Sequence, residues 1–235
     1  MDLGIRRKRT LGIAVAVLVM LAALTVPFGC ASKPTGPTGK TDQGTSVMDK
    51  LYAQVRAEPD PPAGWRRWCD VRHELFVGHP QSPIPEAERA AYQGPPVHPY
   101  DPAARTTAQL RPLPAETVEI ANSDGVTTRF ARFAEATFEL YGQAATLEVF
   151  WLEAYGGGIY LSFRDATSGS TTYGGGRYVL DTVKGADLGA VGDRLVLDFN
   201  FAYNPSCAYD PQWSCPLPPP ANRLPFEIAA GERYP

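Results

Sequence analysis

The sequence predicts a mainly β protein, an antiparallel β-sandwich or partly closed β-barrel with one or two short N-terminal helices. The first indication is the distribution of its 23 prolines: twelve lie between Pro59 and Pro114, eight lie from Pro205 onward, and none occurs in residues 115–204. Proline cannot donate a hydrogen bond to a sheet ladder, so a sheet is expected in the proline-free stretch. The second indication is the series of short apolar runs between glycine-rich turns, which is typical of all-β folds.

Seven strands are expected in and near this stretch. Asp124-Gly125 separates the first two and has the residue types of a tight hairpin turn. In the third strand, Ala136, Phe138 and Leu140 alternate with polar residues, which indicates that one face is exposed. The expected ranges are 116–121, 126–133, 135–141, 145–153, 158–164, 176–182 and 194–202.

Helices are expected only before the sheet. Val47, Leu51 and Val55 recur every four residues and predict one short helix, which the Glu58-Pro59 pair ends. Residues 85–92 predict a second helix that begins with a proline. The remaining prolines of this region predict an irregular, extended segment, anchored on the core by aromatic side chains. These are Trp65, Trp68, Phe76 and Tyr92.

The first thirty residues have the organisation of an export signal. A basic cluster at residues 6–9 precedes an uncharged apolar run over residues 11–26. The positive charges predict a cytoplasmic N-terminus and an extracytoplasmic body. Cys30 follows Gly29 and resembles the acylated cysteine of a bacterial lipoprotein, although Pro27 stands where a leucine is usual. A lipid anchor at Cys30 is the leading prediction, with an uncleaved membrane anchor and plain secretion as alternatives.

Composition limits the number of domains and the classes of partner that the protein can have. Residues 31–46 contain no large apolar side chain and predict a flexible tether, which leaves residues 47–235 as one domain. The chain carries −3 overall, and its first 29 residues contribute four basic groups and one aspartate, so the rest carries −6. An acidic body argues against a nucleic-acid partner. The spacing of His73, His79 and His98 does not match a metal site, and no pattern names a cofactor.

Two blocks rich in polar and aromatic residues stand out, at residues 163–178 and 197–209, and the second continues to residue 225. Together with Gly231-Glu-Arg-Tyr234 they resemble domain-of-unknown-function family 1684, which occurs in bacteria and archaea. The resemblance covers residues 47–235 and includes the segment from His79 to Pro85. It implies membership of a family without an established activity, so the chemistry must be argued from the residues.

One interpretation of these blocks is a binding site at one mouth of the barrel, because aromatic walls with a few converging polar groups are typical of small-ligand sites. In an extended strand, Asp198 and Asn200 would project from the same face, about 7 Å apart. The planar guanidinium of Arg177 would suit a carboxylate or phosphate. The predicted lining consists of Asp165, Thr171, Tyr173, Arg177, Asp198, Asn200, Tyr203 and Asn204.

The alternative interpretation of the same residues is structural. Asp198 and Asn200 would then bind backbone donors of the proline-rich tail, and Asp165 would cap the turn that follows it. Arg177 would be a structural ion-pair partner. An enzyme that uses Asp165, Asp198 and His79 is a further possibility, because histidine titrates near neutral pH.

The cysteines allow two interpretations. Cys207 and Cys215 enclose a short loop and predict a structural disulfide in an exported protein. The alternative is a thiol or metal site beside Tyr203, Asn204 and Tyr209. Cys69 then has no partner and is predicted to be a buried, inert thiol.

The leading functional hypothesis is therefore a lipid-tethered envelope protein that binds a small polar or anionic ligand, or a protein partner. An enzyme of unknown activity and a structural envelope component are the alternatives. Neither a Gly-x-Ser-x-Gly elbow nor a His-Glu-x-x-His helix is present, so the standard hydrolase classes lose support.

Overall fold

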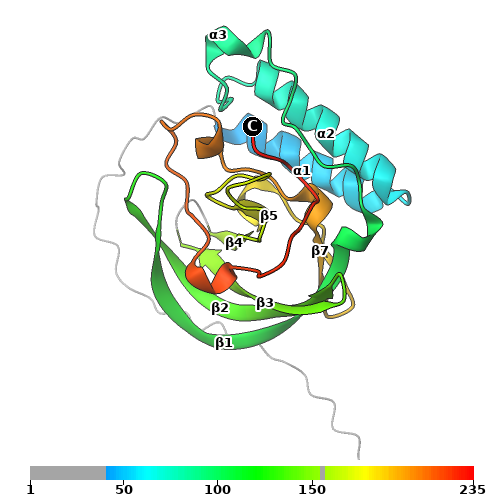
Figure 1. Ribbon diagram of the computed structural model, residues 1–235, viewed down its shortest axis with the longest axis vertical. Helices are drawn as coiled ribbons and strands as arrows, with labels where there is room; N and C mark the ends of the chain where they lie inside the picture. The colour runs from blue at the N-terminus through cyan, green and yellow to red at the C-terminus, as the bar shows by residue number, and fades with distance from the viewer. Residues whose placement is uncertain (1–40, 154–156) are drawn as a thin grey trace, which may run out of the picture. The chain divides into compact units, whose positions relative to one another are not determined.

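One antiparallel sheet of seven strands organises the computed structural model, which describes residues 41–153 and 157–235 (Figure 1). The strand order is β5-β4-β3-β2-β1-β7-β6. The mainly β class is confirmed, and the sheet is not closed into a barrel. The predicted signal segment and Cys30 lie outside the described residues. The strands are β1 (Arg105–Ala121), β2 (Thr127–Leu140), β3 (Gln143–Leu152), β4 (Gly158–Phe163), β5 (Arg177–Asp181), β6 (Ala190–Val191) and β7 (Arg194–Asp198).

Strand β1 begins eleven residues before the expected range 116–121, inside the proline-rich region. It pairs with β7 only as far as Gln109, so Pro112 and Pro114 lie where β1 no longer has that neighbour. Its register with β2 also shifts between Pro112 and Glu116. Edge positions and bulges tolerate proline because no ladder hydrogen bond is lost there. The prediction of an irregular segment up to residue 114 was therefore wrong.

The hairpin predicted at Asp124-Gly125 is confirmed. Ala121 of β1 pairs with Thr127 of β2, and Gly125 adopts the positive φ of 84° that the turn requires. The two strands expected at 126–133 and 135–141 are one strand, β2, because a bulge near Phe133 changes the register against β3 without ending the strand.

The last strand is shorter than expected. β7 ends at Asp198, and η3 (Phe199–Phe201) turns the chain inward as a 3-10 helix. Asp198 caps this turn by accepting a hydrogen bond from the Asn200 backbone N–H at 3.0 Å. The strand geometry expected for residues 199–201 was therefore wrong, whereas Ala202 is extended.

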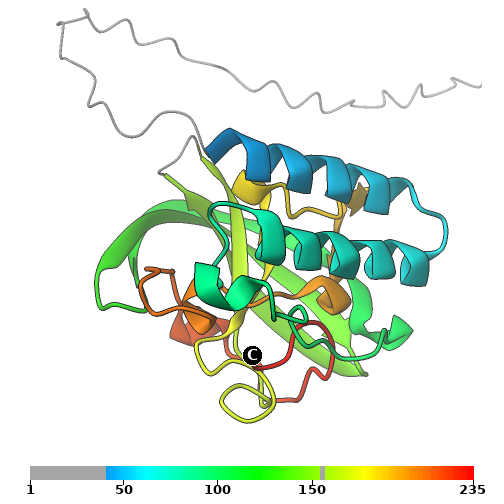
Figure 2. The same cartoon turned by 90° about the horizontal axis from the view of Figure 1, so that it is seen from above.

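Two long helices pack beside each other over one side of the sheet (Figure 2): α1 (Thr41–Ala57) and α2 (Pro61–Gly78). Helix α1 contains the predicted turn around Leu51 and begins at Thr41, within the segment expected to be a tether. In the described part of the chain, no helix has both the length and the hydropathy needed to cross a membrane.

Helix α2 replaces the irregular segment expected around Trp65 and Trp68. Pro61 and Pro62 occupy its first turn, where the missing N–H groups cost nothing, so they begin the helix instead of preventing it. Trp68, Arg72 and Phe76 recur every four residues and form the buried face of the helix. The helix expected at residues 85–92 is reduced to one turn, α3 (Glu86–Arg89).

The C-terminal segment, residues 199–235, fills the concave side of the sheet (Figure 1). Asn222 binds two strands at once: its side chain accepts from the Glu148 N–H at 2.7 Å and donates to the carbonyls of Glu148 and Ser162 at 2.9 and 2.8 Å. Phe201 carries the core toward the helices, with its ring 5.5 Å from that of Trp68. The tail is therefore part of the core and holds the sheet and helices together.

Candidate functional site

A cavity of about 270 Å³ lies between the end of α2, the loop of residues 79–83, η2 (Thr182–Lys184) and residues 203–206. Arg72, His79, Lys184, Tyr203 and Asn204 contribute its polar lining, and α1 and α2 contribute apolar side chains. A mostly apolar wall with a few polar groups is typical of a small-ligand site. The cavity brings together two residues of the predicted lining, the predicted His79, and two cations that the prediction did not contain.

Arg72 is the buried cation of this cavity. Its Nε and Nη2 atoms both lie 2.6 Å from Glu232 Oε1. The guanidinium is also enclosed by the rings of Trp68, Phe76 and Tyr203, with centroid distances of 4.9–5.1 Å. Burial acts to lower the pKa of Arg72, but Glu232 and nearby tyrosines outweigh it and raise the pKa, so the side chain stays charged.

Glu232 holds the floor of the cavity in place. Its carboxylate is fully buried, and Oε2 accepts from the Asn204 backbone N–H at 2.7 Å and from the Tyr209 hydroxyl at 2.9 Å. The Asn204 side chain donates to the Arg233 carbonyl at 2.7 Å, whereas its Oδ1 atom is buried without a partner in the described structure. An unpartnered buried acceptor of this kind costs about 1–3 kcal/mol of folding stability.

Two further donors lie at the cavity. Lys184 Nζ is 3.4 Å from Asp181 Oδ2, and the lysine side chain is more than half exposed. Asp181 also accepts from the Tyr203 hydroxyl at 3.1 Å. The Nδ1 atom of His79 accepts from the Gln81 N–H at 3.1 Å, so the neutral ring carries its proton on Nε2. The cavity therefore presents cationic and neutral donors to a bound group.

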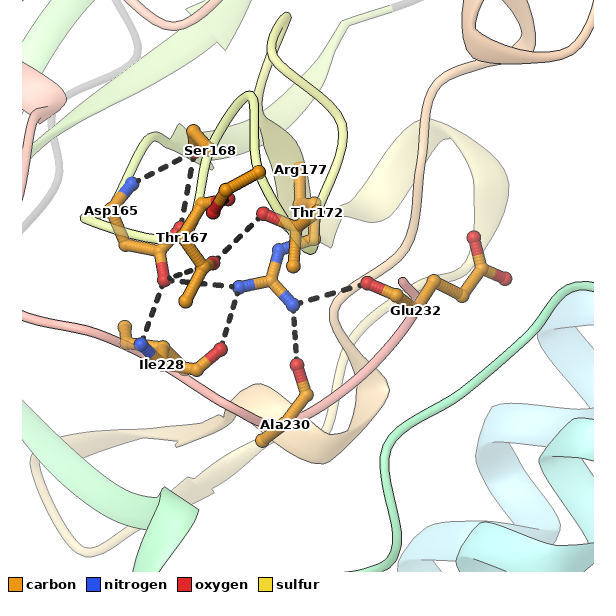
Figure 3. A network of polar contacts seen from close by, with 9 residues as sticks. Asp165, Thr167, Ser168, Thr172, Arg177, Ile228, Ala230 and Glu232 are labelled. Atoms are coloured by element: carbon orange, nitrogen blue, oxygen red, sulfur yellow. Dashed lines mark hydrogen bonds and ion pairs between the residues drawn. The ribbon is translucent and has the colours of Figure 1, made fainter. Parts of the chain in front are cut away.

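Asp165 and Arg177 lie elsewhere, as a buried ion pair beneath the tail (Figure 3). Their Oδ2 and Nη2 atoms are 3.4 Å apart, and both side chains are at most 1% exposed. Arg177 also donates to the carbonyls of Ile228 at 3.0 Å and Glu232 at 3.2 Å, and to that of Ala230. The guanidinium therefore binds the C-terminal segment to β5.

Asp165 also caps the turn after β4 (Figure 3). It accepts from the Thr167 hydroxyl at 2.7 Å, the Ser168 hydroxyl at 3.1 Å and the Ile228 N–H at 2.7 Å. These contacts occupy both carboxylate oxygens. Asp165 does not line the cavity at Arg72.

Asp198 and Asn200 form a third group at the start of β1. Asp198 is fully buried, 3.1 Å from Arg105 Nη1, and accepts from the Asn200 side chain at 2.8 Å. Asn200 in turn exchanges two hydrogen bonds of 2.8 Å with the backbone of Asp101. Burial raises the pKa of Asp198, although Asn200 and Arg105 favour its charged form. These partners fasten the end of β7 to the segment before β1.

The remaining predicted residues lie in other surroundings. Thr171 is exposed, and its carbonyl accepts from the Tyr234 N–H at 3.0 Å. Tyr173 lies 3.6 Å from Cys207 Sγ. Cys207 and Cys215 are adjacent free thiols in this structure, so the predicted disulfide stays a prediction. The eight predicted lining residues thus occupy several separate places instead of one mouth.

A second cavity, of about 490 Å³, lies between β1, β3 and residues 217–220. Arg164 and Arg223 line it together with Glu119 and Glu148, so its charges are mixed. The cavity at Arg72 is the stronger candidate because a buried ion pair and a second cation, Lys184, meet there. No cluster of three or more histidine, cysteine, aspartate or glutamate side chains that suits a metal occurs in residues 41–153 and 157–235.

The residues that sequence reasoning missed are Arg72, Lys184 and Glu232. Arg72 had a detectable signal, because it lies four residues from both Trp68 and Phe76 and therefore shares their buried helix face. A cation on such a face requires a buried partner. Neither its partner Glu232 nor the approach of Lys184 has a local sequence signal.

Comparisons with known proteins agree with the resemblance seen in the sequence. Residues 90–233 match the family described as protein of unknown function DUF1684, and the chain belongs to this family. The solution NMR structure of the uncharacterized protein from gene locus rrnAC0354 of Haloarcula marismortui is similar, with 31% identity and a TM-score of 0.53. The match covers 80% of this chain and 96% of that one. A search of curated proteins finds no match.

Proposed function

We propose that this chain is an exported, lipid-anchored envelope protein whose β domain binds a small anionic ligand in the cavity at Arg72. The observation that carries the proposal is a buried, charged guanidinium, Arg72, and a second cation, Lys184, in the lining of one cavity. The export and the anchor at Cys30 are supported by the signal-like N-terminus.

The chemistry of the lining specifies the ligand. Arg72 and Lys184 each face one carboxylate and retain further N–H donors, which suits a carboxylate or phosphate group. The ligand is therefore a small oxyanion. Asp165 and Asp198, the carboxylates of the enzymatic alternative, do not line this cavity.

Calorimetric titration of the purified full-length chain tests the proposal with two probes, glycerol 3-phosphate and glycerol. Only the first carries a phosphate. Glycerol 3-phosphate should bind at least about tenfold more tightly, since a hydrogen bond to a charged group is worth about 1.5–3 kcal/mol.

Variants separate this site from general charge effects. Lys184→Gln and His79→Gln change groups that are not fully buried, so both variants should fold and bind glycerol 3-phosphate at least several-fold more weakly. Lys50→Gln removes an exposed lysine of α1 that does not line the cavity, and should bind normally. Equal binding by all three variants, or no binding by the unmodified chain at millimolar probe, would refute the proposal.

A further inference from the structure

Two thiols meet at the ends of the loop formed by residues 207–215. The Cys207 backbone N–H donates to Cys215 Sγ at 3.4 Å, and both cysteines are free. Both are buried, and each keeps 9% of its surface exposed. Two thiols this close together can cycle between a reduced and a disulfide form.

The surroundings of the two sulfur atoms differ. The Tyr173 hydroxyl lies 3.6 Å from Cys207 Sγ, and its ring stacks on Tyr234 at 6.2 Å. Burial raises the pKa of Tyr173, so its hydroxyl keeps a proton that it can donate to a thiolate. Of the charged groups, Lys184 acts on Cys215 and favours its thiolate, against the larger opposing effects of Cys207 and burial. Cys207 Sγ therefore lies next to a side-chain donor, the Tyr173 hydroxyl, whereas Cys215 Sγ accepts a hydrogen bond from a backbone N–H.

We propose that Cys207 and Cys215 form a redox-active dithiol that reduces a low-molecular-weight disulfide, with Cys207 as the attacking thiolate. A hydrogen bond from the Cys215 thiol lowers the pKa of Cys207, against the effect of burial, and Tyr173 lowers it further. The same bond raises the pKa of Cys215. The thiolate is the nucleophile in such reactions, so the cysteine with the lower pKa, Cys207, attacks first.

The reaction balances in two steps. Cys207 thiolate attacks one sulfur of the substrate disulfide, forms a mixed disulfide and releases the other half as a thiolate that takes up a proton. Cys215 then loses its proton, attacks Cys207 Sγ, forms the Cys207–Cys215 disulfide and releases the second half. Two electrons pass from the protein to the substrate, and two thiols leave. The proposal does not depend on ligand binding at Arg72.

The test uses the reduced full-length chain and glutathione disulfide, with acid quenching, intact mass measurement and peptide mapping. The unmodified chain should lose two protons at Cys207 and Cys215 and release two molecules of glutathione. In Cys215→Ala, a mixed glutathione disulfide should accumulate at Cys207. In Cys207→Ala, the reaction at Cys215 should be at least about tenfold slower.

Two further variants make the test specific. Tyr173→Phe removes only the hydroxyl, and should slow the reaction at Cys207 several-fold and move its pH midpoint upward. Cys69→Ala is the matched control, because this thiol lies on α2 away from the pair, and it should leave the exchange unchanged. The proposal is overturned if Cys215 reacts as fast without Cys207, or if the disulfide, once formed, cannot be reduced by excess glutathione in the folded chain.

Discussion

Replacing Arg177 with methionine should destabilise the domain strongly, although Arg177 itself does not line the proposed ligand cavity. Methionine has a similar length but no donors, so the carbonyls at residues 228, 230 and 232 lose their shared partner and Asp165 loses its cation. Breaking a buried ion pair from one side typically costs about 3–5 kcal/mol. For a domain of this size, each kcal/mol lowers the melting temperature by about 2–4 °C, which predicts a fall of roughly 10 °C.

Urea unfolding of the full-length chain, followed by circular dichroism, measures this change in unfolding free energy. The matched control is Arg111→Met, which breaks the ion pair with Glu135 at a side chain that is 61% exposed. Exposed pairs contribute about 0–1 kcal/mol, so the control should be almost neutral. If Arg177→Met costs no more than Arg111→Met, the structural role assigned to the Asp165–Arg177 pair is wrong.

Two more predictions concern the same tail. Gly231 has φ of +75°, and an added Cβ would lie 2.5 Å from the Ala202 carbonyl oxygen, so Gly231→Ala should cost about 1–3 kcal/mol; an unchanged melting temperature would contradict this geometry. Burial lowers the pKa of His98, and Arg177 and Arg233 lower it further, so the unfolded chain binds the proton more readily than the folded chain. Stability should therefore increase as the pH rises from the folded-state pKa through about 6.5, and His98→Gln should flatten this part of a plot of melting temperature against pH. Identical slopes for the two chains would show that His98 is not responsible.

Local sequence rules predicted the central part of the fold. The turn at Asp124-Gly125 and the alternating pattern around Phe138 depend only on neighbouring residues; the turn joins β1 to β2, and Phe138 lies in β2. The errors occurred where the outcome depends on a distant partner. Pro112 is tolerated in β1 because the pairing of β1 with β7 stops at Gln109, opposite Arg194, which no local pattern shows. Helix α2 was missed because Pro61 was taken as a helix breaker instead of a first-turn residue.

The sequence by itself determined the fold class, the family, the signal-like N-terminus and the importance of the polar blocks, because period, turn chemistry and long motifs are properties of adjacent residues. Only the tertiary structure decided which polar residues meet. It divided the predicted lining between ion pairs, caps and a cavity, and it joined Arg72 to Glu232 across 160 residues. A buried charge must find an opposite charge in space, and the folded path of the chain decides which residue provides it.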